Sequence, residues 1–327
     1  MGKVAQYSIV INARKRKYRE FLFNYRTTKN ICLLIGDNSA VVELNFCPKS
    51  EEIDYNLKEN TVTKVAIKKA ALLHLALYSK PLLINKIVVY KSGINDRKVS
   101  NFPNPDSCLI CLVESKFGKP LPEAWKTKPF LEGLITLNIS TDSRITASIY
   151  SFLSAKGSKF EYQRFIYLWT SMNGLYGYYW QQSKDGNGHE ASQILNLIKM
   201  KQMGQSFPPK SVNVILAKTI TPWILENIAD DYITDDYFSR DENNEIGGMI
   251  RHLLMANGVD LSPYSYLLFG LSYYYRCQMI HADKPLPLFS FGMESELKVI
   301  RIINCMLESF LERNLPQEVE RIHMLRR

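Results

Sequence analysis

The sequence predicts an α+β domain over residues 1–155, followed by an all-helical bundle over residues 156–327. A chain of 327 residues is long enough for two hydrophobic cores. Its apolar residues alternate in short runs in the first half and recur at three- and four-residue steps from Phe160 onward. Residues 1–156 contain 24 Lys and Arg against 13 Asp and Glu, whereas residues 157–327 contain 17 against 19. Pattern and charge therefore change together, and we expect the boundary near residues 150–158.

Short β-type runs separated by turns fill the first 46 residues, and connections this short favour antiparallel hairpins. One helix is expected over residues 61–78, with His74 among leucines in the core. The Asn, Pro and Ser content of residues 95–107 predicts a loop. The expected strands cover residues 6–12, 21–26, 31–36, 40–46, 86–90, 108–114 and 135–140.

Helical periodicity is clearest in residues 161–180, where seven large residues share one face: Phe165, Leu168, Trp169, Met172, Leu175, Tyr176 and Tyr179. Ser262 and Pro263 are a typical helix start, and the helix that they begin should extend to about Ala282. A last helix is expected over about 294–313, with His323 in a frayed basic tail. Further helices are expected within residues 189–203, 213–228 and 246–258.

The basic first domain should attract phosphate backbones or acidic partners, although a merely solubilising surface explains the charge nearly as well. Within it, Arg14, Lys15, Arg16 and Lys17 lie beside Tyr18. Such a run could bind an RNA backbone, with the tyrosine stacking on a base. A solvated hairpin turn is the alternative interpretation.

Six scattered cysteines are typical of a protein in a reducing compartment, where thiols act as small apolar residues. Cys108 and Cys111 form a single C-x2-C pair, too few ligands for a structural zinc site. No apolar run approaches the roughly 20 residues that span a bilayer. The chain also has no phosphate-binding loop, dinucleotide fingerprint or zinc-hydrolase motif. We therefore expect a cytoplasmic protein with no membrane association, metal or cofactor.

Two separated motifs indicate a family. One helix reads R-F-x-x-L-W-x-x-x-N-x-L-Y, from Arg164 to Tyr176, and a later helix reads Y-x-R-x4-H, with Tyr274, Arg276 and His281. Together with a proline-bearing turn and a closing amphipathic helix, these motifs resemble the HEPN superfamily over about residues 160–315. The resemblance implies a helical bundle, usually a homodimer. It also implies a metal-independent ribonuclease of toxin, abortive-infection or antiviral defence type, whose partner could be an antitoxin or another defence protein.

The resemblance assigns catalysis to Arg276 and His281 and places the polar Asn173 at the substrate. Asn173 could equally cap a contact between helices. RNA supplies its own nucleophile, the 2′-hydroxyl, so an RNA endonuclease of this kind leaves a 2′,3′-cyclic phosphate without a metal. His281 is suited to proton transfer near neutral pH, and Arg276 can donate two hydrogen bonds to phosphate oxygens. A five-residue step turns about 140° on one helix, so a shared dimer cleft would best bring these groups together.

Cys277 departs from the family pattern, in which active members often have Asn, Asp or His directly after the arginine. The departure favours a second interpretation of a different class. The protein could be a non-catalytic regulator that dimerises through its helical domain and binds nucleic acid or a nucleotide signal through its basic domain.

Overall fold

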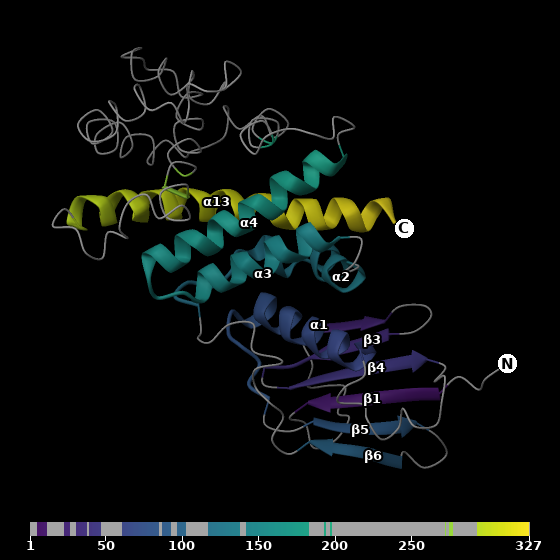
Figure 1. The fold of residues 1–327 in the computed structure, drawn as a ribbon. Helices are drawn as coiled ribbons and strands as arrows, with labels where there is room; N and C mark the ends of the chain where they lie inside the picture. The colour runs from purple at the N-terminus through teal and green to yellow at the C-terminus, as the bar shows by residue number, and fades with distance from the viewer. Residues whose placement is uncertain are drawn as a thin grey trace. The chain divides into compact units, whose positions relative to one another are not determined.

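The computed structural model describes residues 5–11, 23–26, 31–37, 39–46, 61–84, 87–92, 97–102, 117–137, 142–182, 193, 197, 272, 275–276 and 293–326. These residues form an antiparallel sheet and several helices (Figure 1). The chain divides into two compact units, Met1–Leu137 with Pro316–Arg327, and Asn138–Leu315. Among the helices of the described residues, none has both the length and the apolar character needed to cross a membrane.

The sheet belongs to the first unit and has the strand order β2-β3-β4-β1-β5-β6, with every neighbouring pair antiparallel. The antiparallel hairpins predicted from the short connections are confirmed for β2 with β3 and for β3 with β4, whereas β1 pairs with β4 and β5 and not with β2. Residues 95–107 were expected to form a loop, but β6 occupies part of that range and pairs with β5. The strands are β1 (Ala5–Ile11), β2 (Phe23–Arg26), β3 (Ile31–Ile35), β4 (Ala40–Phe46), β5 (Ile87–Ser92) and β6 (Arg97–Phe102).

Two adjacent cross-strand rows of the sheet are buried. Ile11 lies opposite both Ala40 and Ile87, and Ala40 lies opposite Ile35 on its other side. All four of these side chains are buried. The next row is equally buried and consists of Leu34, Val41, Val10 and Val88. Since successive strand residues face opposite sides of a sheet, this end of the sheet is covered on both faces.

Helix α1 (Thr61–Tyr78) contacts β3 and β4 and has the bounds predicted from the sequence. His74 is fully buried, as predicted, and its Nδ1 and Nε2 lie 3.0 Å and 2.6 Å from the carbonyl oxygens of Lys80 and Asp37. Burial lowers the pKa of His74, and the two carbonyl oxygens oppose that shift. The helix ends at Ser79, which adopts a left-handed conformation at φ 54°. Two hydrogen bonds hold Ser79 there, from Phe117 N to its carbonyl and from Leu121 N to its hydroxyl.

Two short elements follow in the same unit, the 3-10 helix η4 (Glu123–Lys126) and helix α2 (Lys128–Thr136). The predicted strand over 135–140 is wrong at Ile135 and Thr136, which are the last residues of α2, and residues 138–140 lie outside the described part. Thr127 caps the helix by accepting a hydrogen bond from Phe130 N. At the other end, Lys69 Nζ donates to the carbonyls of Ile135 and Leu137. Caps at both ends favour a helix over a strand.

Helix α13 (Met293–Leu325) contributes residues to both units and passes through Pro316. The predicted end near residue 313 is wrong because the apolar stripe continues through Leu315, Val319 and Ile322, all buried. The predicted frayed position of His323 is also wrong. Its side chain is 4% exposed, with Nδ1 3.1 Å from Thr136 Oγ1 and Nε2 3.4 Å from Glu132 Oε2.

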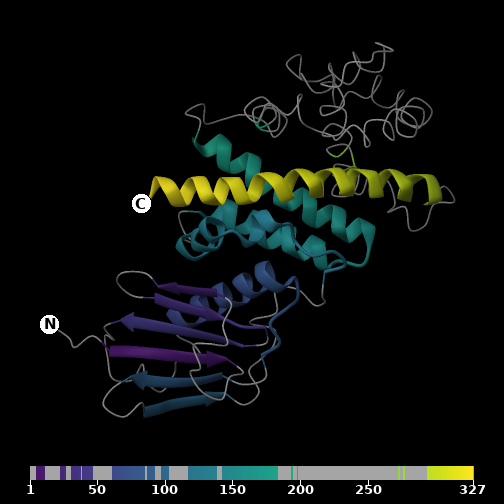
Figure 2. The same ribbon diagram turned by 180° about the vertical axis from the view of Figure 1, so that it is seen from behind.

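The second unit contains α3 (Ser143–Gly157), α4 (Glu161–Gln182) and the part of α13 up to Leu315 (Figure 2). Ser148 and Ser171 join α3 to α4 by reciprocal hydrogen bonds, each hydroxyl donating to the other residue's carbonyl, at 2.6 Å and 2.8 Å. The seven large residues predicted to be inward-facing on α4 are all buried. Because α3 packs along α4, the unit begins at Asn138 and not at the expected residue 156.

Several expected elements lie outside the described residues: the strand 108–114 with Cys108 and Cys111, and the helices predicted within 213–228 and 246–258. Of the helix predicted within 189–203, only Gln193 and Leu197 are described, and both are helical. The predicted inward face of the last helix is confirmed for Ile300, Ile303, Met306, Leu307, Phe310 and Leu311, whereas Leu297 is partly exposed. Cys305 is a free, exposed thiol.

A glycine on α2 permits its close approach to α13. A Cβ built on Gly133 would lie 2.6 Å from Val319 Cγ1 and 3.1 Å from its carbonyl oxygen, whereas one on Gly118 meets nothing within 4 Å. We expect Gly133→Ala to lower the free energy of unfolding by about 2 kcal/mol through overpacking, and Gly118→Ala to change it little. Urea denaturation followed by circular dichroism measures both variants. Equal midpoints for the two would contradict this close packing.

Candidate functional site

Arg276 is helical and half-buried, and the residue before it, Tyr275, is 4% exposed. His281, the other predicted catalytic residue, and the basic run Arg14, Lys15, Arg16 and Lys17 lie outside the described residues. The pairing of Arg276 with His281 and the RNA contact of the basic run therefore stay predictions.

The family motif on α4 divides between two faces of that helix. Its large apolar residues, among them Phe165 and Trp169, are buried. Asn173 is exposed, as a substrate-contacting side chain must be. The motif arginine has a different environment: Arg164 Nη2 is bonded to Glu308 Oε2, and its Nη1 is 3.5 Å from Glu161 Oε2. These ion pairs within the fold account for the presence of an arginine at this position of the motif.

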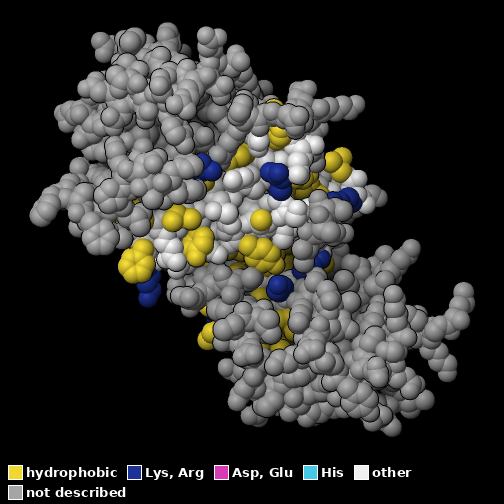
Figure 3. All heavy atoms as spheres, viewed as in Figure 1, with side chains coloured by type: hydrophobic (Ala, Val, Ile, Leu, Met, Phe, Trp, Pro, Cys, Tyr) yellow, Lys and Arg dark blue, Asp and Glu magenta, His cyan; other side chains and the backbone are white. Residues whose placement is uncertain are grey.

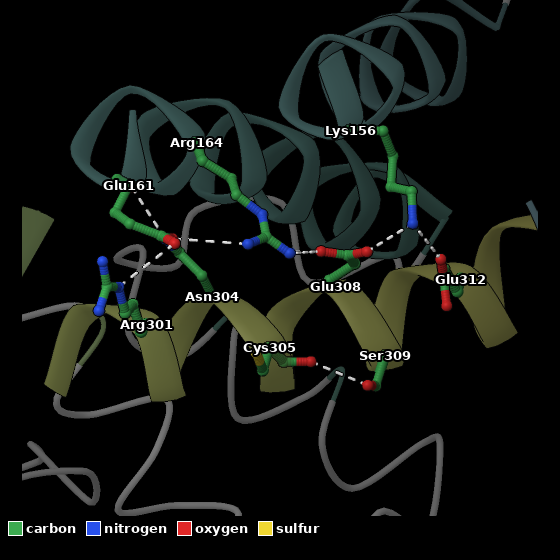
Figure 4. A network of polar contacts seen from close by, with 9 residues as sticks. All are labelled: Lys156, Glu161, Arg164, Arg301, Asn304, Cys305, Glu308, Ser309 and Glu312. Atoms are coloured by element: carbon green, nitrogen blue, oxygen red, sulfur yellow. Dashed lines mark hydrogen bonds and ion pairs between the residues drawn. The ribbon is translucent and has the colours of Figure 1, made fainter. Parts of the chain in front are cut away.

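Glu308, on α13, connects this helix to α3 and α4 (Figure 4). One carboxylate oxygen accepts from Lys156 Nζ of α3 at 2.6 Å, and the other accepts from Arg164 of α4. Lys156 also reaches Glu312 at 2.8 Å. The Lys156 side chain is 5% exposed, so its ammonium has lost most of its hydration and depends on these two carboxylates.

The other end of this network fixes the start of α4. The Asn304 side-chain amide donates to the carbonyl and the carboxylate of Glu161, at 2.8 Å and 2.9 Å, and Arg301 lies 3.6 Å from the same carboxylate (Figure 4). Two contacts from α13 therefore hold the first turn of α4. In chemical terms the network is a set of structural ion pairs, because every member has a partner within the protein.

One further residue was not identified from the sequence. Arg144, in the first turn of α3, extends its side chain over Gly177 of α4, and Gly177 lies one helical turn beyond Asn173. The only signal in the sequence is the presence of two glycines, Gly174 and Gly177, within a strongly helical pattern, which marks a close approach by another element. No local pattern specifies which side chain makes that approach.

No family model, curated protein or solved structure matches this chain.

The two carboxylates on Lys156 offer a matched comparison, since Glu308 also holds Arg164 and Glu312 does not. We expect Glu308→Gln to lower the free energy of unfolding by about 3 kcal/mol, because it leaves buried cationic groups undercompensated. Glu312→Gln should cost about 1 kcal/mol. Chemical denaturation of the full chain measures both. The assignment of Glu308 as the central contact fails when the two variants lose the same stability.

Proposed function

We propose that this protein is a metal-independent RNA endonuclease resembling the HEPN superfamily, with Arg276 and His281 as catalytic residues in a homodimer. The observation that carries the proposal is the division of the α4 motif into a buried aromatic face and an exposed Asn173. A polar residue on the solvent side of the helix is available to contact a substrate, while the aromatic face packs in the core. The half-buried position of Arg276 in a helical segment also supports it, since an arginine there can meet a ligand at the surface.

The proposed reaction needs a base, a stabiliser of phosphoryl charge and a fixed geometry. His281 would remove the proton from the RNA 2′-hydroxyl, which then attacks the adjacent phosphorus, and the 5′-oxygen of the next nucleotide leaves with a proton. Arg276 would donate hydrogen bonds to the phosphoryl oxygens, where charge accumulates. The products are a 2′,3′-cyclic phosphate and a 5′-hydroxyl. Cellular toxicity, an antitoxin or another defence partner would follow from such an activity.

A second candidate is a non-catalytic regulator that dimerises through the helical unit and binds nucleic acid or a nucleotide signal. The environment of Arg164 favours it, because the motif arginine is engaged by Glu308 and Glu161 within the fold. The motif can therefore be retained for its structural role alone. Cys277, in place of the polar residue frequent in active members, favours the same candidate.

We expect Arg276→Ala and His281→Ala each to lower the rate of RNA cleavage by about 10² to 10⁴, the usual contribution of one acid–base or charge-stabilising group. Cleavage by the wild type should persist in EDTA and yield a 2′,3′-cyclic phosphate end. Gel electrophoresis of end-labelled RNA measures the rate, and resistance of the 3′ end to phosphatase identifies the product.

Circular dichroism and thermal unfolding of the same variants provide the control, because a loss of activity is informative only when the fold is retained. Cleavage by the double variant at the wild-type rate rules out these catalytic residues. A wild type that binds RNA tightly without cleaving it supports the regulatory candidate.

A further inference from the structure

The half-buried Arg144 of α3 contacts the buried Gly177 of α4. A Cβ built on Gly177 would collide with the Arg144 guanidinium, lying 3.0 Å from Cζ and 3.4 Å from Cδ. The arginine side chain therefore rests on bare helix backbone, in space that any other residue at position 177 would fill.

The helical positions around Gly177 carry side chains suited to a nucleotide. Residues three and four positions apart are neighbours on a helix surface, which places Asn173, Trp180 and Gln181 around Gly177. Asn173 and Gln181 are exposed, and Trp180 is half-buried. Amide side chains can read the edge of a base, and an accessible indole can stack on it. These groups surround the guanidinium along one stretch of α4.

The charge of Arg144 is not neutralised by the described residues. Arg164 and Arg321 contact the carboxylates of Glu308 and Glu318, whereas the Arg144 side chain has no hydrogen bond or ion pair to any residue in the described ranges. On the face shown in Figure 3, the visible charged side chains of the described residues are Lys and Arg, and none is Asp or Glu. A guanidinium presents five N–H donors in a planar fork that matches phosphate oxygens. Partial burial with unused donors favours an anionic occupant.

We propose that Arg144, resting on Gly177 beside Asn173, binds a backbone phosphate of single-stranded RNA, with the adjacent base held by Trp180 and the two amides. This inference rests on the proposed function, because it gives that activity a substrate-binding subsite. Arg144 binds and orients the strand, and it takes no part in the chemical step assigned to Arg276 and His281.

The opposing explanation is that Arg144 lies over Gly177 only to fill space between two helices. The two glycines of α4 distinguish these explanations. A Cβ on Gly177 meets the end of a flexible side chain, which can move at little cost, but one on Gly174 lies 2.6 Å from the Arg144 carbonyl and 2.9 Å from Ser148 Cβ. Gly177→Ala should therefore displace the guanidinium without unfolding the protein, whereas Gly174→Ala should lower the unfolding midpoint.

The test uses a fluorescein-labelled, single-stranded 2′-O-methyl oligoribonucleotide, which lacks the nucleophile and binds without being cut. We expect Arg144→Gln and Gly177→Ala each to weaken its binding by about tenfold, measured by fluorescence anisotropy. For Arg144→Gln, the slope of log Kd against log salt concentration should fall by about 0.7, the value for one phosphate contact on a single strand. Arg313→Gln is the matched control, because it removes an exposed positive charge from α13, away from the Arg144 contact.

The outcomes separate this inference from the proposed function. When Arg276→Ala abolishes cleavage but Arg144→Gln binds the oligonucleotide as tightly as the wild type, the subsite is wrong and the ribonuclease stands. When the wild type does not cleave RNA but its binding depends on Arg144 and Gly177, the ribonuclease is wrong and the subsite stands. A wild type that does not bind the oligonucleotide overturns the subsite, as does an equal loss of affinity in Arg313→Gln.

Discussion

The carboxylate of Glu308 is the contact on which the arrangement of the second unit depends. It accepts from Lys156 of α3 and Arg164 of α4 at once, while belonging to α13. A nearly buried ammonium is stable only with its partner in place, so the network favours a single arrangement of the three helices. The reciprocal bonds of Ser148 and Ser171 then fix the axial position of α3 on α4. Arg144 lies over Gly177 as a consequence of that register.

This arrangement separates folding from recognition along a single helix. The inner face of α4 carries the buried aromatic residues, and Arg164 is ion-paired within the protein. The outer face carries Asn173 and Gln181, which the fold does not need for packing. The guanidinium of Arg144, from α3, adds a positive charge beside these amides, which favours the binding of an anion at the outer face. The function that we propose depends on this outer face and on Arg276, whereas the resemblance on α4 derives mainly from the inner one.

The sequence by itself determined the elements whose hydrophobic pattern is local. Residues 61–78 and the inner face of α4 follow from helical spacing, and the strand 40–46 follows from a short β-branched run. The core position of His74 also follows from its leucine neighbours. For the candidate site, the motif identified Asn173 and Arg276 as residues of interest but not their surroundings. Local spacing is sufficient in these cases because the pattern of burial repeats within one element.

Only the tertiary structure decided the features that depend on residues distant in sequence. The polar residues of β6 form a strand because their backbone pairs with that of β5. Helix α2 forms where a strand was expected, partly because Lys69 of α1 donates hydrogen bonds to its last carbonyls. His323 is buried because α2 presents Thr136 and Glu132 to it, and α13 continues through Pro316 because its apolar stripe remains buried. The Arg144 contact has the same origin, since a glycine in a sequence shows that space is available and only the packed helices show which side chain fills it.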